Sequence, residues 1–81
     1  MTNLEKYQDV FCKTFDVDKS ALNEEFTPKH VAVWDSMAHM TLIDALEAAF
    51  DVMFEPDDLI NYGSYLNGIE ILKRYGVDFD N

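Results

Sequence analysis

Apolar residues recur every three or four positions near the start of the chain, which is the spacing that places them on one face of a helix. Polar residues fill the positions between them. The apolar stripe consists of Leu4, Tyr7, Phe11 and Phe15. This pattern predicts an amphipathic helix from residue 3 to about residue 15.

No regular spacing continues through residues 16–34, and Pro28 disfavours helical geometry at Thr27. We therefore expect a long loop between the first and second helices. Structureless loops of this length are uncommon in compact domains, so we expect the loop to be ordered, with apolar side chains packed on the core. The candidates for this packing are Val17, Leu22, Phe26, Val31 and Trp34.

A second helix is predicted from about Ser36 to Phe50 or Asp51, because apolar residues again recur at helical spacing. Asp35 stands at or beside its N-cap, where a carboxylate accepts hydrogen bonds from free backbone N–H groups. The apolar stripe consists of His39, Leu42, Ile43, Leu46 and Phe50. The outward face is expected to carry an acidic row, which consists of Asp44, Glu47 and Asp51.

Two further helices are predicted in the last third of the chain. Pro56 suits the first turn of a short helix over residues 56–61. Ser64 is a good N-cap for a final helix, and Gly76 is a suitable residue to end it. The expected apolar stripe of this helix consists of Leu66, Ile69 and Leu72, with Tyr65 as a further candidate.

Together these elements predict an all-α fold, a small four-helix bundle of three longer helices and one short helix. A long loop joins helices one and two, and residues 1–81 are expected to form one domain. The expected core residues of the later elements are Leu42, Ile43, Leu46, Phe50, Val52, Phe54, Ile69 and Leu72.

The chain has 81 residues and a formal net charge of −10, and both numbers narrow the possible functions. A domain of this size buries only about 60% of the surface of its unfolded chain, which argues against a deep enclosed active site. No Lys or Arg occurs between Lys29 and Lys73, so the central part should be strongly negative. This charge argues against nucleic acid as a partner and favours basic proteins, unless it serves only to keep the chain in solution.

Other features of the sequence indicate the cellular compartment of the protein. The single cysteine, Cys12, cannot form an internal disulfide, and no apolar stretch approaches the length of a membrane span. The first residues lack the pattern of a secretory signal. We therefore expect a cytoplasmic monomer with no membrane span.

Asp35, Ser36 and His39 supply the residue types of a hydrolytic triad, but their spacing argues against one. Asp35 would lie near the serine rather than beyond the imidazole, and no glycine-rich elbow accompanies Ser36. The pattern favours His39 as a surface or edge histidine. We predict no catalytic residue and no enzyme activity.

A metal site is not predicted either. Asp16, Asp18 and Ser20 occupy alternate positions as at the start of a calcium loop, but Ala21 and Thr27 replace the required glycine and glutamate. Two roles remain for Ser36. It either belongs to the helix cap, or it is an attachment point for another group. An attached phosphate would be stabilised there by the backbone N–H groups and the positive end of the helix.

Asp35-Ser36-Met37 resembles the Asp-Ser-Leu signature of acyl carrier proteins. The stretch "DSMAHMTLIDALEAAFDVMFEPDDL" is similar to the recognition helix of that family and to the segment after it. Leu42, Leu46, Glu47 and Phe50 stand at the expected distances from the serine. The resemblance extends over nearly the whole chain and implies the same helical bundle.

The resemblance implies that a phosphopantetheinyl transferase attaches 4′-phosphopantetheine from coenzyme A to Ser36, and that Asp35 contributes to recognition by the transferase. Acyl groups would then be held as thioesters on this arm. They would be presented to acyl-loading and acyl-transferring or condensing enzymes with basic docking surfaces, as in fatty acid or polyketide biosynthesis. The partner-binding candidates are Met37, Met40, Asp44, Glu47 and Asp51.

Several alternatives remain open. Val33-Trp34 replaces a Gly-Ala pair that is frequent in fatty-acid carriers, which favours a specialised pathway. Met37 and Met40 either contact partners or are partly buried, and the acidic row either meets basic partners or is only solvated. Two alternative functions remain. The protein could be a peptidyl or aminoacyl carrier, or an acidic helical interaction module that is not modified.

Overall fold

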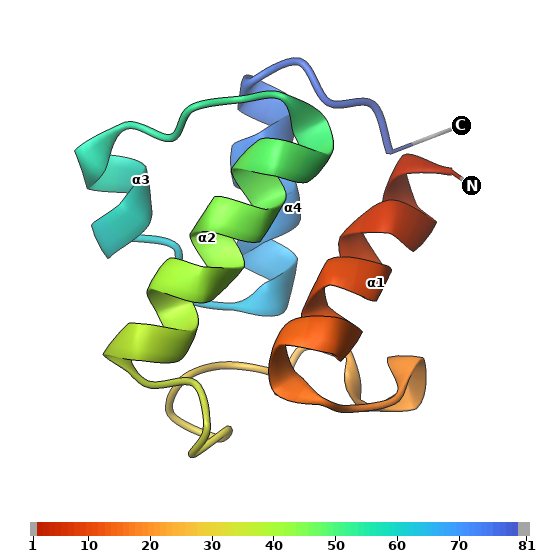
Figure 1. Cartoon of the computed structure of the whole chain (residues 1–81), viewed down its shortest axis with the longest axis vertical. Helices are drawn as coiled ribbons and strands as arrows, with labels where there is room; N and C mark the ends of the chain where they lie inside the picture. The colour runs from red at the N-terminus through yellow and green to blue at the C-terminus, as the bar shows by residue number, and fades with distance from the viewer. Residues whose placement is uncertain (1, 80–81) are drawn as a thin grey trace.

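The structure is a computed structural model that describes residues 2–79, and over this range it contains α-helices, one short 3-10 helix and no strands (Figure 1). The predicted all-α architecture is confirmed. Residues 1, 80 and 81 of the predicted domain lie outside the described residues. The elements are α1 (Asn3–Phe15), η1 (Lys19–Ala21), α2 (Ser36–Phe50), α3 (Pro56–Ile60) and α4 (Tyr65–Arg74).

The three longer helices begin at polar caps that the sequence supplies. The Thr2 side chain accepts the backbone N–H of Glu5, and the Glu5 carboxylate accepts the backbone N–H of Thr2, so the two residues form a capping box at α1. Asp35 caps α2, as predicted, and Ser64 caps α4. The starts of these helices are therefore determined by short-range chemistry.

The ends of α1 and α2 share one sequence, Phe-Asp-Val. Asp16 and Asp51 follow the last helical residues with φ values of 55° and 54°, in the left-handed region that glycine usually occupies at this position. The next residue in each case, Val17 or Val52, donates its backbone N–H to a carbonyl five residues earlier, at 3.2 Å. Both helices are thus ended by the same backbone motif.

Aromatic side chains make up much of the interior. Phe11 is fully buried, and its ring meets Trp34 and Tyr65 edge-on, with ring centroids 5.7 Å and 5.1 Å apart. Phe26 and Trp34 bring the segment between α1 and α2 into this interior. The buried hydrophobic residues are Tyr7, Phe11, Phe15, Phe26, Trp34, Leu42, Ile43, Leu46, Phe54, Tyr62, Tyr65, Ile71 and Leu72.

The apolar stripe predicted for α4 was partly wrong. Leu66 is 45% exposed, whereas Tyr65, Gly68, Ile71 and Leu72 face the interior. The reason is a bond outside the helix: the backbone N–H of Tyr65 donates to the Phe26 carbonyl at 3.0 Å. With the Tyr65 ring inside the aromatic cluster, the helix is rotated so that the next residue, Leu66, points outward.

Two buried tyrosines form a polar contact inside the core. The hydroxyl groups of Tyr7 and Tyr62 lie 2.7 Å apart, and the Tyr7 hydroxyl donates to the Tyr65 carbonyl at 2.6 Å. Burial raises the pKa of both tyrosines, so both stay neutral. Gly68 of α4 faces these two hydroxyls, and a Cβ at this position would overlap both of them.

The short helix α3 is fastened to the end of α4 through Asp58. The Asp58 carboxylate accepts hydrogen bonds from the Tyr75 hydroxyl and from the Arg74 guanidinium, the latter at 2.7 Å. The Tyr75 hydroxyl in turn accepts the backbone N–H of Glu55 at 2.9 Å. These bonds tie the N-cap and the first turn of α3 to the end of α4.

The Asp58 contact should make stability depend on pH. The hydrogen bonds from Tyr75 and then Arg74 lower the pKa of Asp58 below its ordinary value. The stabilisation is therefore fully present above the pKa of an unfolded carboxyl group and is lost as pH falls through the lowered pKa. We expect urea unfolding to show a stability difference between wild type and Asp58→Asn at pH 6 that disappears at strongly acidic pH.

Asp57→Asn is the matched control, because Asp57 is the exposed neighbour of Asp58 on the same helix turn. It should leave unfolding at pH 6 closer to wild type than Asp58→Asn does. An equal loss in both variants would contradict the assigned contact.

None of the described helices is long and apolar enough to cross a membrane.

Candidate functional site

Ser36 is the first residue of α2, and its side chain is exposed. The preceding residue, Asp35, has extended backbone geometry and accepts the Ala38 N–H on its carboxylate at 2.9 Å. Within residues 2–79, the Ser36 hydroxyl makes no hydrogen bond to the chain. The hydroxyl therefore stands accessible at the positive end of a 15-residue helix.

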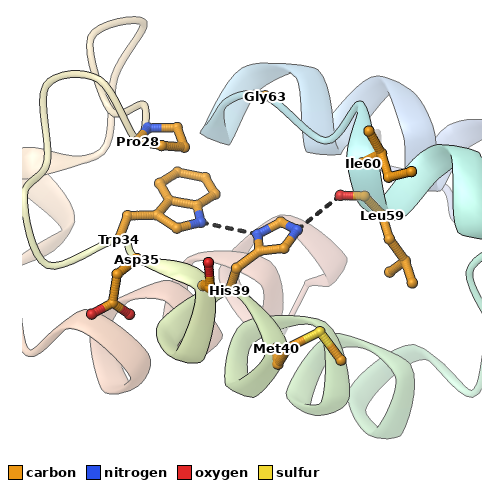
Figure 2. A pocket seen from close by; sticks show the side chains of 9 residues that line it. Pro28, Trp34, Asp35, His39, Met40, Leu59, Ile60 and Gly63 are labelled. Carbon is orange, nitrogen blue, oxygen red and sulfur yellow. Dashed lines mark hydrogen bonds between the residues drawn. The ribbon is translucent and has the colours of Figure 1, made fainter.

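An open pocket of about 570 Å³ lies directly beside this serine. Its walls come from three parts of the chain: the first turn of α2, the short helix α3 with the residues after it, and the segment that precedes α2 (Figure 2). The lining residues are Pro28, Trp34, Asp35, Ser36, His39, Met40, Leu59, Ile60 and Gly63. The described part of the chain thus places Ser36 and Asp35 at the edge of a largely apolar depression.

His39 is half-buried at the pocket, which fits the edge position that the sequence indicated, but its ring is fixed by two hydrogen bonds. Its Nδ1 accepts the indole N–H of Trp34 at 3.0 Å, and its Nε2 lies 2.9 Å from the Leu59 carbonyl oxygen (Figure 2). Because an indole N–H only donates, Nδ1 must accept, and Nε2 therefore carries the hydrogen that is donated to Leu59. The planes of the two rings are inclined by only 26° and their centroids are 6.2 Å apart, so the rings lie edge to edge along this hydrogen bond.

Both partners of His39 are polar groups that would otherwise lack a hydrogen bond. Trp34 is only 4% exposed, and a buried indole N–H requires an acceptor. The Leu59 carbonyl belongs to the last turn of α3, where carbonyl groups have no partner within the helix. Sequence reasoning missed this bridge because Leu59 is 20 positions from His39.

These bonds also decide the geometry of the suspected triad. Both ring nitrogens of His39 are engaged by Trp34 and Leu59, and the Asp35 carboxylate is engaged by the cap. The imidazole therefore offers no unoccupied nitrogen to the Ser36 hydroxyl. The three residues lie close together but are not connected as a proton relay.

The exposed apolar residues around the pocket settle one of the open alternatives. Met37 and Met40 are 81% and 52% exposed, so both lie on the surface and neither is part of the core. Ile60 on α3, which sequence reasoning missed, is 80% exposed and lines the pocket opposite Met40. These flexible and branched apolar side chains border Ser36 from two helices.

The acidic row is only partly free to meet a partner. Asp44 and Asp51 are exposed, and no ion pair within the described range involves either of them. Glu47 is half-buried, and its carboxylate accepts the backbone N–H of Phe54 at 2.9 Å. Glu47 therefore has a structural role that the sequence pattern did not indicate.

No family model, curated protein or solved structure matches this chain. The function of the site has to be inferred from its geometry and from the pattern around Ser36.

Proposed function

We propose that this protein is a carrier that holds acyl groups as thioesters on a 4′-phosphopantetheine arm joined to Ser36. The observation that carries this proposal is the exposed Ser36 hydroxyl at the first position of α2, beside Asp35 and an open pocket. The protein itself would perform no chemistry. It would present the arm to a sequence of partner enzymes.

The attachment step fits the chemistry of the site. The Ser36 oxygen would attack the pyrophosphate of coenzyme A, form a phosphodiester to pantetheine and release adenosine 3′,5′-bisphosphate. The serine proton would go to a base of the phosphopantetheinyl transferase, because His39 has no free nitrogen to accept it. The new phosphate would lie near the N–H groups at the start of α2, where negative charge is stabilised.

The surface around Ser36 supports docking by partner enzymes. Exposed Met37, Met40 and Ile60 offer adaptable apolar contacts, and Asp44 and Asp51 add negative charge further along α2. Loading, transferring or condensing enzymes with basic surfaces would be attracted to this face. The long connection between α1 and α2, held at Phe26 and Trp34, is a further point of agreement with the carrier fold.

The same surface favours one alternative function, an acidic helical module that binds basic proteins without any modification. Its supporting observation is that Asp44 and Asp51 carry no intramolecular ion pair within residues 2–79. A peptidyl or aminoacyl carrier would use the same attachment to Ser36 and would differ only in the group that it carries.

Intact-mass measurement after incubation with coenzyme A and a broad-specificity phosphopantetheinyl transferase tests the proposal. We expect the mass of one phosphopantetheine to be added, and peptide mapping to locate it on Ser36. A protein that stays unmodified while a known carrier is modified by the same enzyme would refute the carrier function and leave the interaction module.

Charge reversal on α2 tests the docking face, and Asp44 is a better position than Glu47 because its side chain is exposed. We expect Asp44→Lys to raise the KM of the transferase for this protein about threefold at low salt, and high salt to remove the difference. Glu70→Lys on α4 is the matched control and should leave KM unchanged. Equal effects of both variants would show that only the net charge matters.

A further inference from the structure

His39 connects three elements that line the pocket beside Ser36. Its ring lies between Trp34, which precedes α2, and the Leu59 carbonyl at the end of α3 (Figure 2). The residue itself belongs to the first turn of α2. One side chain therefore joins two walls of the pocket, the segment before α2 and the helix α3.

The helix α3 depends on such bonds for its position. It has five residues, and helices this short are not stable without tertiary contacts. Away from the pocket it is held by Asp58 through Arg74 and Tyr75. On the pocket side, the hydrogen bond from His39 to Leu59 ties its last turn to α2.

The position of α3 decides what a partner enzyme meets. Met40 belongs to α2 and Ile60 belongs to α3, and both line the pocket with exposed side chains. A partner can contact both side chains and Ser36 together only when α3 is held against α2. A preformed surface binds more tightly than one that must be ordered on binding.

We propose that His39 is a positioning residue for the modification of Ser36: it holds α3 and Trp34 together, and so keeps the two sides of the docking surface in register. This inference rests on the proposed function. His39 touches none of the reacting atoms, because both its nitrogens are occupied by the protein. Its loss should therefore weaken docking and leave the chemical step at Ser36 unchanged.

Steady-state kinetics with a phosphopantetheinyl transferase and coenzyme A, in which the concentration of this protein is varied, test the inference. For His39→Leu, which removes both hydrogen bonds, we expect KM to rise about fivefold while kcat stays within about twofold of wild type. Because this protein is the varied substrate, an unfolded fraction would by itself raise apparent KM at unchanged kcat. KM is therefore expressed per folded protein, with the folded fraction measured by far-UV circular dichroism, and a merely structural role would leave this corrected KM at the wild-type value.

Two conservative variants separate the two bonds. Asparagine places a carbonyl oxygen near the position of Nδ1 and can still accept from Trp34, whereas glutamine places an amide near Nε2 and can still donate to Leu59. We expect His39→Asn and His39→Gln each to raise KM only about twofold. Because each variant keeps one bond, this comparison remains decisive even if His39→Leu does not fold.

Trp34 supplies an independent spectroscopic readout, since it is the only tryptophan in the chain. Loss of the hydrogen bond from the indole N–H shifts tryptophan emission to shorter wavelength. We expect this shift in His39→Gln but not in His39→Asn. His30→Leu is the matched control, because His30 is an exposed histidine of the loop, and it should change neither KM nor emission.

The possible outcomes distinguish this inference from the proposed function. If wild type accepts no arm, the proposed function fails and the inference fails with it. If wild type is modified but His39→Leu has the wild-type KM per folded protein, with or without a reduced kcat, only the inference is overturned. A raised KM with unchanged kcat, restored in part by Asn and Gln, supports it.

Discussion

Ser36→Ala is expected to abolish the addition of phosphopantetheine completely. The chain has three serines, and Ser36 alone stands as the first residue of a long helix beside the pocket. Removal of its oxygen removes the only atom that the proposed phosphodiester can use. Intact mass after incubation with coenzyme A and transferase measures the result, and the variant should keep the unmodified mass.

The loss must come from chemistry and not from unfolding. The Ser36 side chain makes no hydrogen bond within the described residues, and Asp35 supplies the cap, so the free energy of unfolding should change by less than about 0.5 kcal/mol. Ser20→Ala is the matched control, because Ser20 is an exposed serine of η1. It should be modified as fully as wild type, and residual addition to Ser36→Ala would show that the attachment site lies elsewhere.

Gly68→Ala is expected to destabilise the fold by about 3 kcal/mol, which for a domain of this size lowers the melting temperature by more than about 10 °C. The new methyl group would overlap the hydroxyls of Tyr62 and Tyr7. Relief of the overlap requires both rings to move. This breaks the buried hydrogen bond that Tyr7 donates to the Tyr65 carbonyl and the one that it accepts from the Tyr62 hydroxyl. The higher helix propensity of alanine offsets only about 1 kcal/mol.

Two variants make the result for Gly68 specific. Gly76→Ala tests the same exchange where no atom lies within 4 Å of the added carbon, so only the cost of its positive φ of 91°, about 1 kcal/mol, should appear. Tyr62→Leu removes both the hydroxyl and the ring carbon Cζ that the methyl group would overlap, so Gly68→Ala should cost less stability in that background than in wild type. A Gly68→Ala protein as stable as Gly76→Ala would contradict the packing of α4 on the tyrosine pair.

Helix boundaries were predictable from the sequence because they depend on neighbouring residues. The Asp35 carboxylate finds its partner N–H three residues away, and Ser64 does the same at α4. The rotation of α4 was not predictable in this way. Tyr65, Leu66 and Ile69 are compatible with two different faces, and the choice between them is made by the bond from Tyr65 to the distant Phe26 carbonyl.

The features of the candidate site also divide into those that neighbouring residues determine and those that depend on distant parts of the chain. The exposure of Ser36 and the capping role of Asp35 follow from the local pattern. The engagement of His39 does not, since its acceptor is a carbonyl of α3 that becomes available only because that helix ends at Ile60. Glu47 is a similar case, because its bond to the Phe54 backbone depends on how the chain returns after α2.

The Phe-Asp-Val ends of α1 and α2 place an aspartate where stability alone would favour glycine. Asp16 and Asp51 each have a left-handed backbone, and each adds negative charge at the negative end of a helix dipole. Glycine at either position would make the protein more robust, but at residue 51 it would also remove a charge from the acidic row. Thermal robustness and surface acidity are therefore opposed at this position, and selection for one would be made at the expense of the other.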